Sequence, residues 1–275
     1  MSKNVTVRRT AWDGQFSSFF ADLAAGLRMT DLWRTFAWDE MQQRYRRSIL
    51  GVLWILVAYA MFVGGVSIIF SAFTRQDGSF FLMHVAIGYA AFNFITGNIT
   101  DGCTVFTGAR GWIHSIALPH SIHVYRSICR SVFTFGLQFI VAAIILVAAG
   151  WQPSWLNLWV LPAIVIFLLN AIAVQYLMGL ISARFRDVSH LVSSVTRLLL
   201  FVTPILWTRF DLRGTRSYLA DFNPVAHYVE IFRAPLMNLE PRPLSWVVVL
   251  VLTVLVWIAA SLAAARMRRR LAYWL

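Results

Sequence analysis

The sequence predicts an all-α integral membrane protein with six transmembrane helices. The first observation is composition: 59% of the 275 residues are hydrophobic and only 13% are charged, whereas soluble domains carry about a quarter charged residues. The second is that six apolar stretches are long enough to cross a bilayer core about 30 Å thick. These stretches are residues 49–73, 80–100, 127–149, 156–183, 188–207 and 244–265.

The loops between these stretches distribute positive charge unevenly. In this topology eighteen of the 24 basic residues fall on one side of the membrane and six on the other. Because basic residues are enriched in cytoplasmic loops, both termini are expected in the cytoplasm. The formal charge of +12 then follows from topology and needs no nucleic-acid partner. The chain divides into a cytoplasmic N-terminus at 1–48, a membrane domain at 49–265 and a basic tail at 266–275.

The N-terminal part predicts a short helix near residues 16–27 and a second helix that starts at Thr30 and Asp31, a plausible N-cap. Along the second helix, apolar side chains recur at spacings of three and four and face Arg34, Gln43 and Arg47. The apolar set is Trp33, Phe36, Ala37, Met41 and Tyr45. This pattern predicts an amphipathic helix at the membrane interface. Packing inside a soluble domain is disfavoured, because the chain contains no such domain.

Residues 101–130 form the first long cytoplasmic loop of this topology. The loop carries Arg110, Arg126 and Arg130 against the single acid Asp101, yet it also contains many apolar side chains. Glycines and Pro119 divide it into short pieces. A short, turn-rich and partly apolar loop is expected to dock on another protein.

The segment 208–243 on the opposite side predicts a short helix. Asn223 and Pro224 are suited to cap and start it, and the following apolar residues keep helical spacing for about 14 residues, too few to span a bilayer. The helix is expected to dip into the outer leaflet with His227, Glu230 and Arg233 on its polar side. A simple periplasmic cap is equally compatible with the pattern.

Several functions are disfavoured by what the sequence lacks. Lys3 is the only lysine, so the chain cannot form a P-loop, which needs a lysine on the phosphates. None of the twelve acids falls inside an apolar stretch, which disfavours ion-coupled transport, and their scatter disfavours a glycosyltransferase. His120 and His123 lack further ligands nearby, so no metal site is expected. A passive conduit, or one driven by a partner, remains.

Two features of the apolar stretches leave alternatives open. Tyr59, Phe62, Phe70 and Phe73 share one helical face, which packs against lipid or other helices more often than it lines a pore, although sugars stack well on aromatic rings. Arg197 lies about 14 Å into its stretch. It faces water or an anion, or, as we favour, it reaches back to the membrane surface.

Five motifs occur in order along the chain. They are RYRRSILGVLW at 44–54; GCTVF at 102–106 continuing to LP at 118–119 and HVYR at 123–126; SARFRDV at 182–188; TPILW at 203–207; and NPVAHYVEIFRAPL at 223–236. Together they resemble the permeases of polysaccharide-export ABC transporters, the type-2 exporters of O-antigen, teichoic acid and capsule. The absence of a proline at 57–59 suggests the O-antigen branch.

The resemblance implies a homodimer in the bacterial cytoplasmic (inner) membrane that exports a lipid-linked polysaccharide. Two separate ATPase subunits would bind ATP and Mg²⁺, so this chain would be a permease without enzymatic activity or cofactors of its own. A non-energised channel, scramblase or scaffold, or a membrane glycosyltransferase, is the alternative.

Candidate sites follow from the motifs and the topology. The ATPase would dock on the two cytoplasmic turns, at Asp101, Arg110, Trp112, His114, Pro119, Arg184, Arg186 and Asp187. The substrate channel would contain Tyr59, Phe62, Phe70, Phe73, Phe201 and Trp207. Arg44, Arg46 and Arg47 match phosphate geometry and would hold the carrier lipid at its entrance, although anchoring to acidic membrane lipids explains them as well. The periplasmic gate would contain Asn223, Pro224, His227, Glu230 and Arg233.

Overall fold

The computed structural model describes residues 17–72, 76–208 and 218–275, and within these ranges it is helical without strands, which confirms the all-α prediction. The first half contains α1 (Ser17–Arg28), α2 (Thr30–Tyr45), α3 (Leu53–Phe70), α4 (Gly78–Thr104), η1 (Thr107–Ala109), α5 (Arg110–Ser115) and α6 (Ser121–Ala148). The second half contains η2 (Trp155–Trp159), α7 (Val160–Arg184), α8 (Asp187–Val202), α9 (Tyr218–Phe222), α10 (Pro224–Leu236), α11 (Pro243–Met267), η5 (Arg268–Arg270) and α12 (Leu271–Trp274).

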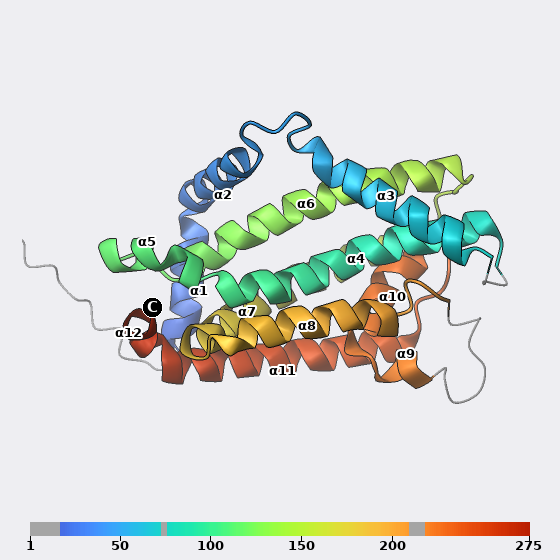
Figure 1. The fold of residues 1–275 in the computed structure, drawn as a ribbon. Coiled ribbons are helices and arrows are strands. Elements are labelled where there is room, and N and C mark those ends of the chain that lie inside the picture. The colour runs from blue at the N-terminus through green and yellow to red at the C-terminus, as the bar shows by residue number, and fades with distance from the viewer. Residues whose placement is uncertain (1–16, 73–75, 209–217) are drawn as a thin grey trace, which may run out of the picture.

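Five of the described helices are long and apolar enough to cross a membrane, namely α3, α4, α6, α7 and α11. The long helices run along a common direction, and α3 crosses them at an angle (Figure 1). At one end of this bundle, the α5 end, lie α1, α5 and α12; at the other, the α9 end, lies α9 (Figure 1).

The fifth predicted span differs from the expectation. The helix α8 has 16 residues, or about 24 Å, which is shorter than a bilayer core. It ends at Val202 because Thr203 precedes Pro204, and a residue before proline avoids the helical region; Thr203 has an extended backbone, with ψ 136°. Five spans are therefore present as long helices, and the predicted count of six is not confirmed.

The helix α2 has the two faces that the sequence predicts. Ala37 and Met41 are buried where α2 packs along α6, whereas Arg34 and Gln43 are exposed. The start of α2 differs by one residue, because Met29 occupies the cap position and Thr30 is already helical. Much of the apolar face therefore packs on protein.

The helix α4 is the centre of the bundle, with α3, α6, α7, α8 and α10 packed around it. Two glycines allow α4 and α7 to approach closely at the α5 end. A Cβ on Gly102 would lie 2.9 Å from the Gln175 Cα, and one on Gly179 would lie 2.6 Å from a methyl group of Val105. Larger residues at either position would push the turn after α4 away from α7.

The helix α10 is a core helix, contrary to the expectation of a polar side in the outer leaflet. Apart from Pro224 and the half-buried Glu230, its residues are buried, because α4, α7 and α11 pack around it. His227 and Arg233 are about as buried as the apolar residues. The helical pattern identified the element but not its surroundings.

Candidate functional site

A groove of about 340 Å³ lies at the α5 end of the bundle. The turn after α4, the turn between α7 and α8 and the C-terminal segment form its walls. The lining residues are Cys103, Thr104, Thr107, Arg110, Ser182, Ala183, Arg186, Ser189, Trp274 and Leu275; we call this the end groove. The structure thus brings both predicted docking segments, which lie some 80 residues apart in the sequence, to one cavity.

The predicted docking residues fall into two groups. Arg110 and Arg186 line the end groove. Trp112 is 44% exposed, and its ring lies 5.1 Å from that of Phe36 on α2. The remaining members do not line the groove. His114 and Asp187 are exposed, and Pro119 is half-buried. Arg184 stacks over the rings of Phe185 and Trp274, and Asp101 pairs with Arg130 at 3.0 Å. Asp101 therefore faces the bundle rather than the groove.

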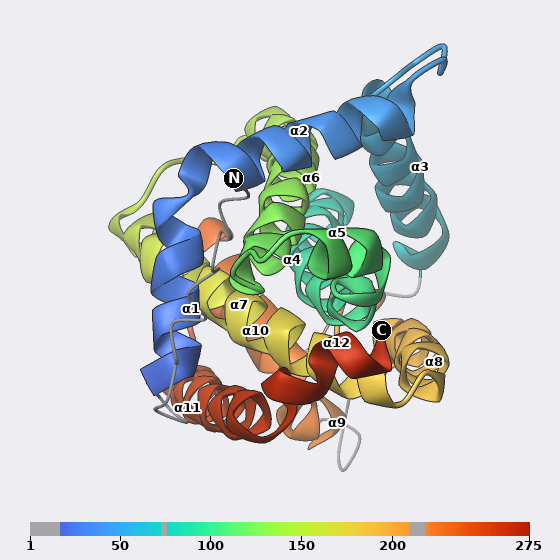
Figure 2. The same ribbon diagram turned by 90° about the vertical axis from the view of Figure 1, so that its left-hand side faces the viewer.

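The C-terminal wall of the end groove was missed by the sequence analysis, which treats 266–275 as a basic tail. In the structure Leu271 is fully buried and Leu275 is 7% exposed, and α12 packs on α7 and α5. Figure 2, which looks onto this end, shows α12 beside α5 and α8. The apolar residues after the arginines were the available signal.

A buried carboxylate ties the chain's first helix to this end of the bundle. Asp22 on α1 is 2% exposed, and its oxygens accept hydrogen bonds from the backbone N–H groups of His120 and Ser121, both at 3.0 Å. It therefore supplies an anion to the positive N-terminus of α6. Arg268 lies 3.5 Å from it, so α1, α6 and the C-terminal segment meet at one carboxylate.

The surroundings of Asp22 lower its pKa. Burial alone would raise the pKa of this carboxyl group, but the hydrogen bond with His120, the charge of Arg268 and the bond from Ser121 outweigh burial. The pKa therefore lies below its ordinary value, and Asp22 is ionised at neutral pH. The sequence carried no specific signal for this role.

The predicted channel residues on α3 pack inside the subunit. Tyr59 is buried and its hydroxyl donates to the Ala86 carbonyl; the ring of Phe62 stacks on Tyr89 with centroids 3.8 Å apart. Phe70 is half-buried against the same helices. Phe73 lies outside the described residues. Within one subunit these rings face α4 and α6.

The helix α8 presents a different surface. Phe201 is 65% exposed, and His190, Ser194 and Arg197 lie on the same helical face and are exposed too, at spacings of three, four and seven residues. Trp207 is half-buried and donates from its indole nitrogen to the Phe201 carbonyl at 3.0 Å. In both views α4 lies between α3 and α8 (Figures 1 and 2), so one side of the molecule combines an aromatic helix with a partly polar one.

The three predicted entrance arginines follow one another where α2 ends. All three are exposed. Arg47 has a positive φ of 67°, in the loop that leads from α2 to α3. Arg44 borders a polar pocket between α4 and α6. Arg46 and Arg47 do not line that pocket.

The predicted gate residues form a buried network at the α9 end. Asn223 caps α10 by accepting from the Val225 N–H at 3.0 Å, and donates to the Thr203 hydroxyl at 2.9 Å. Arg233 donates to the Pro204 carbonyl at 2.6 Å and pairs with Glu230 at 3.1 Å. The network therefore holds the start of α10 and the end of α8 together.

Two further gate residues join this network. Pro224 is the first residue of α10. His227 contacts the Ser245 hydroxyl at 3.0 Å and the Asp221 carbonyl at 2.8 Å, which links α10 to α11 and α9. His84 on α4, which the sequence analysis did not single out, lies 3.0 Å from Arg233 and contacts the carbonyl groups of Pro204 and Trp207 at 3.1 and 3.2 Å.

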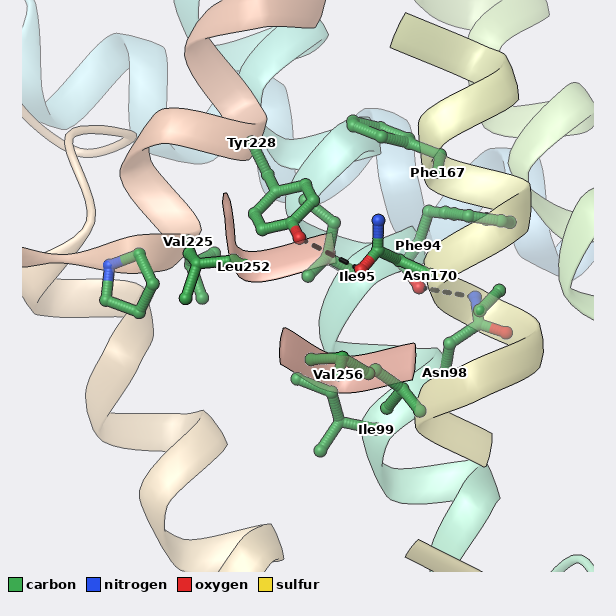
Figure 3. A pocket seen from close by; sticks show the side chains of 13 residues that line it. Phe94, Ile95, Asn98, Ile99, Phe167, Asn170, Val225, Tyr228, Leu252 and Val256 are labelled. Carbon is green, nitrogen blue, oxygen red and sulfur yellow. Dashed lines mark hydrogen bonds between the residues drawn. The ribbon is translucent and has the colours of Figure 1, made fainter. Parts of the chain in front are cut away.

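A second cavity, of about 250 Å³, lies between α4, α7, α10 and α11. Figure 3 shows mostly apolar side chains around it, including Phe94, Phe167 and Leu252. The polar side chains of this cavity hydrogen-bond to other groups of its wall: Tyr228 donates to Asn170 at 3.0 Å, and Asn98 donates to the Phe94 carbonyl at 2.7 Å. No charged side chain lines it, so it suits hydrocarbon better than sugar or phosphate.

Comparison with known families assigns this architecture. The family model described as "ABC-2 type transporter" matches residues 31–237, which is most of the chain and includes the predicted docking and gate residues. The chain belongs to the ABC-2 type transporter family. It is therefore the membrane-spanning permease subunit of an ABC exporter, with several apolar helices, and the channel, scramblase and glycosyltransferase alternatives are not favoured.

Three relatives of this ABC-2 permease share similar names. An O-antigen export system permease protein RfbA from Myxococcus xanthus is 23% identical over 82% of this chain and 89% of its own length. Two proteins of the same name from Klebsiella pneumoniae are 21% and 22% identical, over 78% and 72% of this chain and 85% and 77% of their own lengths. The predicted resemblance to polysaccharide-export permeases is confirmed.

Proposed function

We propose that this ABC-2 permease exports a lipid-linked polysaccharide, of the type that its relatives' name describes, as a homodimer bound to two ATPase subunits. The end groove is the observation on which this proposal chiefly rests. A permease without a P-loop lysine must receive ATP-driven motion from another chain, and the end groove joins the turn after α4 to the turn between α7 and α8. Arg110 and Arg186 would meet acidic groups of that subunit.

The α5 end is cytoplasmic in this proposal. The helix α1 and the basic C-terminal segment lie at this end (Figure 1), as the positive-inside rule requires. The helix α8 and the chain that continues from it to Thr208 form the sixth crossing. Because α8 alone is shorter than the bilayer core, the buried turn at Thr203–Leu206 completes the distance within protein, where irregular backbone is tolerated.

The homodimer would close around the side of the molecule formed by α3, α4 and α8. Polar side chains on a helix within a membrane bundle face water or another chain, and the exposed row of His190, Ser194 and Arg197 on α8 satisfies this rule in a shared conduit. Phe201 would supply an aromatic rung for sugars. Because Tyr59 and Phe62 pack on α4, they would shape the wall behind that conduit rather than touch the polymer at rest.

The arginines after α2 would act where the carrier lipid enters. Arg44 in the last turn of α2 and Arg46 and Arg47 just after it are exposed. The loop from there leads to the start of α3, where Leu53 and Trp54 are 55% and 49% exposed. Arginine pairs with phosphate oxygens bidentately. A diphosphate could bind there while its hydrocarbon chain stays in the bilayer.

Affinity purification from native membranes tests the proposal. A P-loop ATPase should copurify with the tagged permease, and the purified complex should hydrolyse ATP. The double variant Arg110→Glu and Arg186→Glu should lose most of the bound ATPase. Arg34→Glu, which reverses an exposed charge on α2, is the matched control and should retain it. A permease that transports without any ATPase would support the channel alternative, and sugar transfer without ATP would support the glycosyltransferase.

A further inference from the structure

A polar pocket of about 150 Å³ lies between α4 and α6, with Arg44 of α2 at its edge. Its side chains come from two helices that are long and apolar enough to cross the membrane. Asn93 and Asp101 lie on α4, and Arg130, Thr134 and Gln138 lie on α6. We call this the polar pocket.

The depth of the polar pocket makes its chemistry unusual. Gln138 is 11 residues into the apolar stretch 127–149, or about 16 Å along the helix, and is 9% exposed. Polar side chains at such a depth are costly unless they meet water, protein or a ligand. Thr134 bonds back to the Arg130 carbonyl at 3.1 Å, whereas the Gln138 amide makes no hydrogen bond to the described part of the chain. Its amide is therefore available to an occupant.

The pocket is not primarily an anion site. Arg130 already pairs with Glu40 and, at 3.0 Å, with Asp101, and Arg126 lies 3.5 Å from Glu40, so two arginines and two carboxylates balance one another. Arg44 at the edge is exposed and is the lining residue that could attract an anion from outside. The interior offers neutral amides and hydroxyls together with a balanced ion pair.

This combination fits a sugar ring. Sugar hydroxyls both donate and accept hydrogen bonds, and the pocket offers both kinds of partner through amide, hydroxyl, carboxylate and guanidinium groups. Phe94 and Phe135 also line the pocket, and their aromatic rings can pack against the apolar C–H face of a sugar ring. The pocket volume of about 150 Å³ equals that of a cavity that binds benzene in another protein, so the pocket accommodates part of a sugar ring, with the other substituents outside it.

The way into the pocket also suits a lipid-linked sugar. The helix α3 diverges from α4 toward its N-terminal end (Figure 1), where its side chains are exposed, and it packs on α4 and α6 further along, at Tyr59 and Val63. Arg44 at the edge of the pocket is therefore joined by a short loop to a helix start with exposed apolar side chains, Leu53 and Trp54. A sugar in the pocket would leave its diphosphate near Arg44 and its hydrocarbon chain in the bilayer beside the start of α3.

We propose that the polar pocket binds the sugar that is attached directly to the carrier-lipid diphosphate, and that it lets the permease distinguish a loaded carrier from an empty one. This inference rests on the proposed function, because it assumes a lipid-linked polysaccharide as substrate. Gly97 offers a direct way to test it. Gly97 lines the pocket, and a Cβ there would meet no atom within 4 Å, so a larger side chain would fill the cavity.

The experiment compares two lipids on the purified permease–ATPase complex in nanodiscs. Undecaprenyl diphosphate carrying N-acetylglucosamine should bind about tenfold more tightly than undecaprenyl diphosphate, as expected for one or two well-placed hydrogen bonds. Gly97→Leu should remove this preference while affinity for the bare carrier stays within about twofold. Gly136→Leu is the matched control: it is a mid-helix glycine on α6 with open space around it, does not line the pocket, and should keep the preference.

Gln138→Leu provides a second variant that changes polarity at nearly constant size, and it should also remove the preference. Equal affinity of the wild type for both lipids, or a preference that survives Gly97→Leu and Gln138→Leu, would overturn the pocket assignment. Failure of the proposed function looks different, because the complex would then bind neither lipid and would show no ATP turnover in response to either.

Discussion

The Arg233 guanidinium on α10 donates a hydrogen bond to the Pro204 carbonyl, 2.6 Å away, where the chain leaves α8. The proline ends α8, its own carbonyl lies in the turn beyond the helix, and the arginine binds that carbonyl from another helix. Arg233 is 4% exposed, and its charge is balanced by Glu230. Any opening of α10 would therefore act on the end of α8 as well.

Replacing Arg233 with Met should destabilise the permease by about 3 kcal/mol, because Glu230 would remain largely buried without its partner. Thermal unfolding of the purified protein measures this loss. Arg242→Met is the matched control: its partner Asp221 lies at 3.0 Å, but the arginine side chain is 44% exposed, so the loss should stay below about 1 kcal/mol. Equal losses at both positions would contradict the role of the buried network.

Replacing Asp22 with Asn should loosen α1 at neutral pH by about 2 kcal/mol, because a neutral amide makes weaker bonds to the amide groups of His120 and Ser121. The pKa of Asp22 is lowered in the folded state. The carboxylate therefore contributes stability above its unfolded-state pKa, and the contribution is lost as pH falls through the lower folded-state value.

Hydrogen exchange at the start of α6 measures this effect. The wild type and Asp22→Asn should differ in amide protection at pH 6, and the difference should shrink when the pH falls well below 4. A difference that persists unchanged in strong acid would show that the charge of Asp22 is not responsible.

Replacing Trp112 with Ala should lower substrate-stimulated ATP turnover while membrane insertion stays intact. Trp112 projects from α5 beside the end groove and contacts Phe36 on α2, so its loss would remove both a docking side chain and the support behind it. The measurement is ATP hydrolysis by the complex with added lipid-linked glycan. Trp155→Ala removes a tryptophan that is 87% exposed at the α9 end and should leave turnover unchanged.

Replacing Phe201 with Ala should reduce polysaccharide export several-fold, because a stacking contact contributes about 1 kcal/mol, without changing thermal stability. Export is measured as glycan that appears on the outer side of the membrane, per folded permease. Ile144→Ala on α6 is the control, with a side chain that is 63% exposed on a helix away from α8. If both variants export equally, α8 does not line the conduit.

Replacing Arg44, Arg46 and Arg47 together with Gln should reduce export beyond any loss of protein from the membrane, since three positive charges would no longer attract the carrier diphosphate. The pair Arg28→Gln and Arg34→Gln removes exposed charges from α1 and α2 and serves as the control. Normal export per folded permease in the triple variant would leave only anchoring to acidic lipids as the role of these residues.

The sequence predicted the helices more reliably than their surroundings. Five of the six spans that apolar length predicted are present as long helices, and the repeated spacing of Trp33, Phe36 and Met41 identified α2. The same reasoning gave α10 an exposed polar side, because a helical pattern records which residues share a face but not what covers that face. His227 and Arg233 are covered by polar partners from α4, α9 and α11, and the α4 partner His84 lies 149 residues from Arg233 in the chain.

The sequence by itself determined that this is a helical membrane protein, because length and hydropathy are local properties. From the lack of a P-loop lysine and the composition of two turns it also predicted an ATPase partner and the place where that partner would dock. Only the tertiary structure decided which side chains meet. Asp22 reaches His120, Arg233 reaches Pro204, and Gln138 shares a pocket with Asn93, through contacts between helices far apart in the chain. No spacing along one helix specifies those contacts, since they depend on how several helices pack at once.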